Sequence, residues 1–167
     1  MREQLTKKDV ERIEQEIEHR KLVVRKEAIE AVKEARAHGD LSENFEYHAA
    51  KKDKNKNESR IRYLERMLKT AEIVSEESAA NEVGLNDTVT LYFEEDDECE
   101  VFRLVTSIRG NSLKNLISIE SPLGKAVYGK KLGDRVLVPV GAEGGYYVEI
   151  RAIEKTGDDG SDTIRAY

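Results

Sequence analysis

Tryptophan is absent from this chain of 167 residues, and Cys99 is its only cysteine. A single cysteine excludes an internal disulfide and any zinc site built from cysteines, and it fits a reducing cytosol. No apolar run reaches the length of a membrane span or a signal peptide, and Met1-Arg2-Glu3-Gln4 opens the sequence without an apolar core. We therefore expect a soluble, cytoplasmic monomer that does not bind a membrane.

Large apolar side chains are also scarce. Charged residues make up 37% of the chain and hydrophobic residues 38%, which is too little apolar material for one large core. This balance favours an elongated helical part joined to a small globular part.

Charge is distributed unevenly along the chain. Residues 1–75 carry 18 Lys and Arg against 16 Asp and Glu, whereas residues 76–167 carry 10 against 18. The sequence pI is about 5.3. An acidic chain is a poor ligand for duplex DNA, because binding to phosphates needs a basic surface. Any contact with nucleic acid should therefore be local or arranged by a larger partner.

Proline and glycine are missing from two long segments, residues 6–37 and 41–75, and Gly39 lies between them. A glycine past the end of one helix, followed by Asp or Ser before the next, indicates a helix stop and then a helix start. We predict an antiparallel helical hairpin whose arms are about 45 Å long, at ~1.5 Å per residue. Its first arm begins at a Thr6 cap and carries a narrow apolar seam that is interrupted at Arg20 or Lys21; the seam consists of Val10, Ile13, Ile17, Val24, Ala28, Ala31 and Ala35.

Two carboxylates, Asp40 and Glu43, lie at the predicted bend, within the tip at residues 38–47. Their spacing fits a capping box, in which Asp40 is the N-cap of the second helix and Glu43 its partner. The same spacing also places both carboxylates on one side of the first turn. Two oxygen ligands cannot enclose Mg²⁺, but they can complete a site whose other ligands come from a partner. The spacing alone leaves both interpretations open.

In the second half of the chain, apolar residues recur at every second position, as they do in β-strands, and turn residues separate these segments. Ser121-Pro122-Leu123 reads as a loop that enters a short helix. We divide the chain into a hairpin at 1–75, a linker at 76–82, a β-rich domain at 83–156 and a disordered tail at 157–167.

Two segments resemble a known family. Glu34-Ala35-Arg36-Ala37-His38-Gly39-Asp40-Leu41-Ser42-Glu43-Asn44-Phe45-Glu46-Tyr47-His48-Ala49-Ala50-Lys51 is similar to the tip of the bacterial transcript-cleavage factors of the GreA/GreB type. Ile117-Ser118-Ile119-Glu120-Ser121-Pro122-Leu123-Gly124-Lys125-Ala126-Val127-Tyr128-Gly129-Lys130-Lys131-Leu132-Gly133-Asp134 resembles the C-terminal domain of the same family. The two segments occur in the family's order and separation, and the likeness runs from about Leu5 to about Ile153.

The resemblance implies an α+β fold, with an N-terminal coiled-coil hairpin and a C-terminal FKBP-like β-rich domain. It implies binding to bacterial RNA polymerase, with the hairpin in the secondary channel and the β-rich domain docked on the channel rim. Asp40 and Glu43 match the family's acidic positions, which help the polymerase hold its second Mg²⁺ and a water while backtracked nascent RNA is cut. By this resemblance the chain is not an independent enzyme and has no cofactor of its own, and Ser121, Pro122 and Leu123 are docking candidates.

Two further features of the hairpin are interpreted in the light of this resemblance. Phe45 stands where the family usually has a small residue, so its ring either stacks on a base or packs against Tyr47 and the first arm; we favour packing. Lys52, Lys56 and Arg60 share a helix face by i, i+4 spacing. That face is either an ordinary solvated surface or a patch that steers the RNA 3′ segment to the tip.

Two alternative functions remain open. A channel-binding inhibitor would have the same shape without promoting cleavage, but the intact Asp40 and Glu43 pair argues against it. Prolyl isomerisation by the β-rich domain would need an aromatic-lined pocket, whereas Phe93 and Phe102 alternate as core strand residues.

Overall fold

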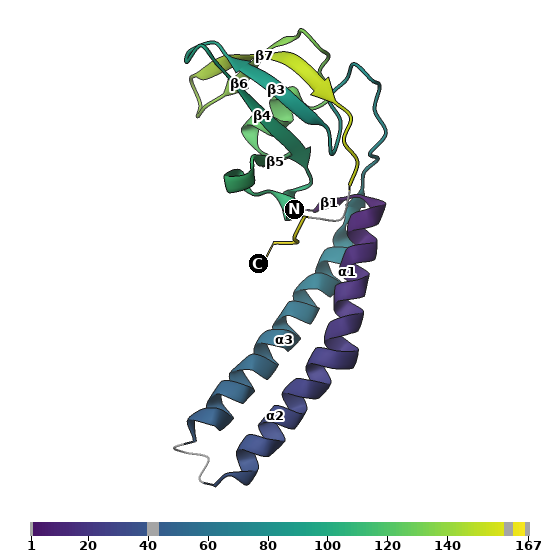
Figure 1. Cartoon of the computed structure of the whole chain (residues 1–167), viewed down its shortest axis with the longest axis vertical. Helices are drawn as coiled ribbons and strands as arrows, with labels where there is room; N and C mark the ends of the chain where they lie inside the picture. Colours follow the sequence, from purple (N-terminus) through teal and green to yellow (C-terminus); the bar gives the residue numbers. More distant parts are fainter. Residues whose placement is uncertain (1, 40–43, 159–161, 166–167) are drawn as a thin grey trace. The chain divides into compact units, whose positions relative to one another are not determined.

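The computed structural model describes residues 2–39, 44–158 and 162–165, and the chain divides into two compact units (Figure 1). The hairpin unit runs over Lys7–Glu72. The sheet unit comprises Glu3–Thr6 and Ile73–Ala166. Among the helices of these described residues, none is long and apolar enough to cross a membrane.

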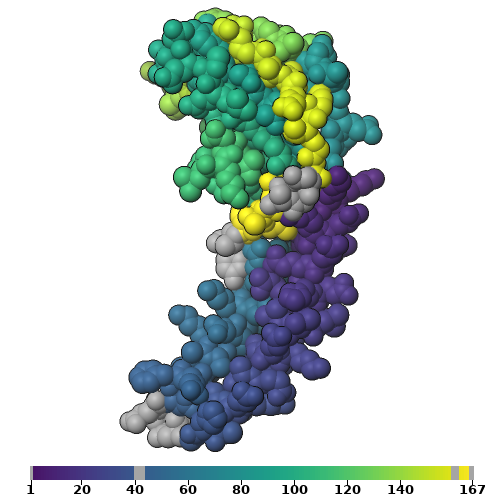
Figure 2. All heavy atoms as spheres, viewed as in Figure 1, coloured from purple at the N-terminus to yellow at the C-terminus, as the bar shows by residue number. Residues whose placement is uncertain are grey.

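Two helical arms make the hairpin unit. The first arm consists of α1 (Lys7–His19), the π-helical segment η1 (Arg20–Val24) and α2 (Arg25–Ala37), and the second arm is α3 (Phe45–Thr70). The arms lie side by side, and their atoms meet along the hairpin (Figure 1, Figure 2). The side chains buried along this contact include the apolar residues Ile13, Ala35, Ile61, Leu64 and Met67. The predicted antiparallel hairpin is confirmed.

The interruption of the apolar seam coincides with the π-helical segment. The Arg20 guanidinium donates to Glu16 Oε2 at 2.8 Å and to Asn57 Oδ1 of the other arm at 2.9 Å. A π-helical turn has one more residue than an α-helical turn, so it changes which residues face the partner arm. Beyond it Val32 is half-buried whereas Ala31 is exposed, so the prediction of Ala31 as a seam residue is wrong.

A five-stranded mixed sheet forms most of the sheet unit, with the strand order β5-β4-β3-β7-β6. All neighbouring strands are antiparallel except β4 and β5, which are parallel. A separate two-stranded sheet pairs β1 (Gln4–Leu5) with β2 (Glu72–Ile73). The remaining elements are β3 (Thr88–Phe93), β4 (Glu98–Val105), η2 (Ser107–Arg109), η3 (Ser112–Lys114), β5 (Leu116–Ser118), α4 (Pro122–Val127), β6 (Arg135–Pro139) and β7 (Gly145–Glu154).

Buried and more exposed side chains alternate along the strands, so that one face of the sheet lies in an apolar core. Val89 and Leu91 of β3 are fully buried there, and Val127 of α4 packs against them in the same cluster. Phe93 lies edge to face with Phe102, with 6.1 Å between ring centroids, at the margin of this core. The predicted α+β fold, a helical hairpin followed by a β-rich domain, is confirmed.

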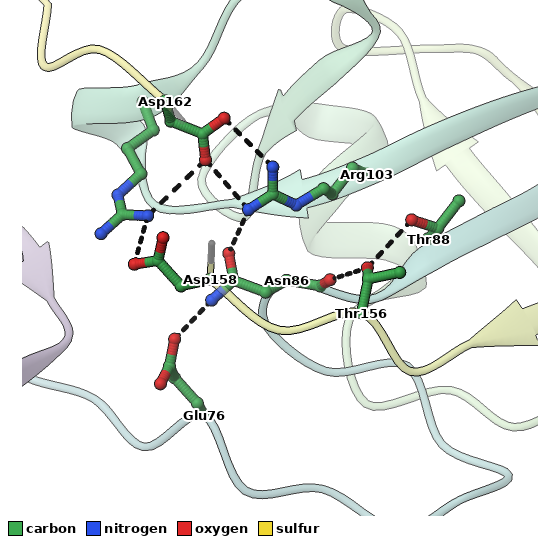
Figure 3. Close-up of polar contacts among 8 residues, drawn as sticks. Glu76, Asn86, Thr88, Arg103, Thr156, Asp158 and Asp162 are labelled. Atoms are coloured by element: carbon green, nitrogen blue, oxygen red, sulfur yellow. Dashed lines mark hydrogen bonds and ion pairs between the residues drawn. The ribbon is translucent and has the colours of Figure 1, made fainter. Parts of the chain in front are cut away.

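The described part of the C-terminal segment lies against the sheet unit (Figure 3). Asp158 Oδ2 is 2.6 Å from Arg109 Nη1, and Asp162 Oδ2 is 2.9 Å from Arg103 Nη2. Arg103 also donates to the side-chain oxygen of Asn86 at 3.1 Å. For these residues the prediction of a disordered tail is wrong. The acidic side chains that suggested disorder form ion pairs with arginines of the sheet unit that lie far from them in the sequence.

Candidate functional site

The hairpin tip is the candidate functional site, and its structure is described on both sides of the bend. Asp40 and Glu43 lie outside the described residues. The first arm ends at Ala37, followed by His38 and by Gly39 with a φ of 125°. A positive φ of this kind favours glycine, since a Cβ would crowd the backbone. The second arm begins at Phe45.

Asn44 organises the start of the second arm. It is the N-cap of α3, and its side-chain oxygen accepts a hydrogen bond from the Tyr47 amide at 3.0 Å. Its side-chain nitrogen donates to the Ala35 carbonyl near the end of α2 at 2.7 Å. The N-cap is therefore Asn44, and the interpretation of Asp40 as the N-cap, one of the two that the spacing left open, is wrong. One amide side chain satisfies a free N–H of one helix and also binds a C=O near the end of the other, which accepts from the His38 amide as well.

A second contact joins the two arms beside the bend. His38 Nδ1 lies 3.1 Å from Glu46 Oε2, and both side chains are exposed. This pair and the Asn44 side chain hold the ends of the two arms together close to the positions of Asp40 and Glu43 in the sequence.

Positive charge gathers around Tyr47. The Arg36 guanidinium lies over the Tyr47 ring, 5.7 Å from its centroid, and the His48 ring meets the Tyr47 ring edge-on at 5.4 Å. A hydrogen bond from Arg36 lowers the pKa of the Tyr47 hydroxyl, and the charges of Lys51 and Lys54 act in the same direction. The surface behind the tip thus favours anions.

Phe45 is 87% exposed. The favoured prediction, that its ring packs against Tyr47 and the first arm, is wrong. Tyr47 pairs instead with Arg36 and His48. Phe45 is the first residue of α3, and the contacts of this turn with the first arm are made by its neighbours Asn44 and Glu46.

The basic face does not form as the sequence suggested. Lys52 and Lys56 are exposed, but Arg60 is buried in the contact between the arms, where its Nε donates to Glu16 Oε2 at 2.9 Å. Successive i, i+4 steps rotate by about 40° each, so Arg60 lies about 80° around the helix from Lys52. The prediction that Arg60 faces RNA is wrong, whereas Lys52 and Lys56 stay candidates.

The docking candidates of the sheet unit have largely structural contacts. Ser121 is the N-cap of α4, and its Oγ accepts from the Gly124 amide at 3.1 Å. Pro122 is the exposed first residue of α4, whereas Leu123 packs against the core cluster. Leu113, which the sequence did not single out, exposes 95% of its surface. Pro122 therefore stays a docking candidate, and Leu123 contributes mainly to the core.

Within the described part of the chain, no group of three or more His, Cys, Asp or Glu side chains is arranged to hold a metal ion. The metal ligands expected from the sequence, Asp40 and Glu43, are outside that part.

Comparisons with known proteins match most of both units. Residues 3–73 match the family described as transcription elongation factor, N-terminal, and residues 77–155 match transcription elongation factor, GreA/GreB, C-term. The chain is 42% identical over 155 residues to transcription elongation factor GreA of Streptococcus pneumoniae and of Streptococcus sanguinis, covering 91% of this chain and 95% of each relative.

Solved structures give similar matches. A structure of the transcription factor Gfh1 is 30% identical and covers 92% of this chain and 97% of that chain, with a TM-score of 0.46. A prokaryotic transcription elongation factor GreA/GreB from Nitrosomonas europaea is 30% identical and covers 57% of this chain and 79% of that chain, with a TM-score of 0.40.

Proposed function

Because the chain belongs to the GreA/GreB family of transcription elongation factors, we propose that it binds bacterial RNA polymerase through the secondary channel and stimulates the polymerase's own cleavage of backtracked nascent RNA. The hairpin unit enters the channel and the sheet unit docks outside it. The chain restores a paired RNA 3′ end to an arrested complex and does not hydrolyse RNA by itself.

The observation that carries this proposal is the cap of α3. A structural explanation of the acidic pair required Asp40 to cap the second helix, and Asn44 fills that position with a 3.0 Å hydrogen bond from Tyr47. Asn44 thus occupies the N-cap position of α3. Two acidic residues that precede this capped helix in the sequence, between the two arms, fit a role toward a partner.

The chemistry is hydrolysis of one phosphodiester of the RNA. A water oxygen forms a bond to phosphorus while the bond from phosphorus to the 3′ oxygen of the upstream RNA breaks; that oxygen takes up a proton and becomes the new 3′ end. Mg²⁺ held by the polymerase would supply Lewis acidity and an activated water. Asp40 and Glu43 would offer carboxylate oxygens to that ion, and its other ligands would come from the polymerase and from water, because Mg²⁺ needs six.

The test is transcript cleavage on a stalled, backtracked elongation complex. We expect rapid Mg²⁺-dependent cleavage with the native protein and a loss of at least about a hundredfold with Asp40→Ala plus Glu43→Ala, at unchanged binding to polymerase. Glu34→Gln is the matched control, since it removes an exposed carboxylate of α2 near the same end of the hairpin; it should keep most of the activity.

Other outcomes would contradict the proposal. Binding without cleavage by the native protein would make it an occupier of the channel, which is the inhibitor alternative. Equal cleavage by the native protein and the double variant would show that the acidic pair has no part in the reaction.

A further inference from the structure

An exposed phenyl ring stands at the start of the second arm. Phe45 is the most exposed of the large apolar side chains in the described hairpin unit, and the only aromatic one among those that are exposed. Its backbone is fixed, because Asn44 caps the same turn and is tied to Ala35 of the first arm. The ring is therefore presented from a defined position on a helix.

A single exposed apolar side chain is common on protein surfaces and does not by itself indicate a binding site. The residues around Phe45 must therefore show whether it belongs to one. The residues next to Phe45 are engaged within the hairpin, Glu46 with His38 and Tyr47 with Arg36. The following turns of α3 carry four lysines against one aspartate up to residue 56: Lys51, Lys52, Lys54 and Lys56.

This combination distinguishes nucleic acid from protein as the occupant. The centre of a protein–protein contact is depleted of charge and gathers several apolar side chains. A surface for single-stranded nucleic acid instead combines an aromatic ring, on which a base stacks, with cations that follow the backbone. Among the described residues of the tip, Phe45 is the only exposed large apolar side chain, and lysines follow it along α3, which is the second pattern.

We propose that Phe45 stacks on an unpaired base of the RNA 3′ segment extruded by backtracking. The inference rests on the proposed function, which brings the tip to that segment. Stacking holds the segment so that its phosphodiester lies beside the acidic pair, and purines, with the larger ring face, are held better than pyrimidines. Phe45 is a positioning residue that contacts the substrate away from the reacting atoms.

Fluorescence tests the contact directly. 2-Aminopurine is placed in turn at each extruded position, and the Asp40→Ala plus Glu43→Ala background keeps the RNA whole. We expect addition of this protein to quench the fluorescence at one position, because stacking quenches this base. Phe45→Ala should abolish the quenching and Phe45→Tyr should retain it. The same fluorescence with Phe45 and with Phe45→Ala at every position would overturn the proposal.

Cleavage kinetics test its consequence. We expect Phe45→Ala to raise the half-saturating concentration of the factor about tenfold on intact RNA, which is within the range for one base–aromatic stack. With an abasic nucleotide at the quenched position, the half-saturating concentration of the native protein should rise by the same factor. The half-saturating concentration of Phe45→Ala should be the same on abasic and on intact RNA. Leu22→Ala, which removes another exposed apolar side chain of the hairpin unit, should have no effect on either RNA.

The outcomes separate this inference from the proposed function. If Phe45→Ala is impaired equally on intact and abasic RNA, the ring contacts the polymerase and the inference fails while the function stands. If the native protein never stimulates cleavage but quenching depends on Phe45, the function fails and the stacking contact stands.

Discussion

At the scale of single residues, Asn44 shows how one side chain sets the geometry of a functional tip. A carboxylate can accept a hydrogen bond from a helix N–H, but it cannot donate to a carbonyl. Asn44 does both, toward Tyr47 and Ala35. This use of an amide explains how one side chain both caps α3 and ties its start to the end of α2.

We expect Asn44→Ala to lower the free energy of unfolding by about 1–2 kcal/mol, because it removes a cap and a hydrogen bond between the arms. Asn44→Asp keeps the acceptor for Tyr47 and loses the donor to Ala35, so its loss should be smaller. Urea unfolding gives the free energies, and amide hydrogen exchange at Tyr47 reports the cap. Unchanged exchange at Tyr47 in Asn44→Ala would contradict the assignment.

At the scale of elements, the two arms are joined by a polar cluster as well as by an apolar seam. Glu16 accepts from Arg20 of its own arm and from Arg60 of the other arm, where the π-helical segment begins. Burial raises the pKa of Glu16, but the hydrogen bonds from Arg60 and Arg20 outweigh it, so the pKa lies below its ordinary value of 4.5. The cluster fixes the register of the arms, because a shift of one arm would separate Arg60 from Glu16.

We expect Arg60→Ala to lower the free energy of unfolding by about 2 kcal/mol at pH 7. A folded pKa below 4.5 means that this stabilisation is full above that pH and is lost as the pH falls through the lower folded value. The difference between the native protein and Arg60→Ala should therefore shrink in acid. Arg62→Ala, an exposed arginine on the same helix, should cost under about 0.5 kcal/mol. Urea unfolding from pH 3 to pH 7 checks both, and a pH-independent difference would contradict the role of Glu16.

The elements that the sequence predicted well are those with local signals. Gly39 between two segments free of proline and glycine indicated the hairpin, and the polar residues Arg20 and Lys21 indicated an interruption of the apolar seam but not its π-helical form. Features set by contacts between distant segments were not predictable in this way. Arg60 was placed on the wrong face because the rotation of i, i+4 steps accumulates and Glu16 attracts it across the hairpin. Phe45 was expected to pack, but the first arm contacts its neighbours Glu46 and Tyr47 while its own ring stays exposed.

At the scale of the whole chain, each unit has its own polar cluster to hold a long segment in place. In the hairpin unit it is centred on Glu16, and in the sheet unit it gathers the residues after β7 around Arg103 and Arg109 (Figure 3). The side chains of Arg109 and Asp158 are almost fully buried. Buried charges of this kind require their partners, since an uncompensated charge is costly away from water.

The contribution of the C-terminal segment to the sheet unit can be measured in the full-length protein. We expect Asp158→Asn plus Asp162→Asn to destabilise the sheet unit by about 2 kcal/mol, since Arg109 and Arg103 stay buried without their carboxylates. That loss corresponds to a fall in melting temperature of about 10 °C for a unit of this size.

The control is Glu95→Gln plus Asp96→Asn, which neutralises two exposed residues of the turn between β3 and β4. It should shift the melting temperature by no more than about 2 °C. Calorimetry gives the melting temperatures, and amide exchange assigns the change to Leu91 in the core of the sheet unit rather than to Leu64 in the hairpin. Equal melting temperatures for the two double variants would mean that the segment rests on the sheet unit without stabilising it.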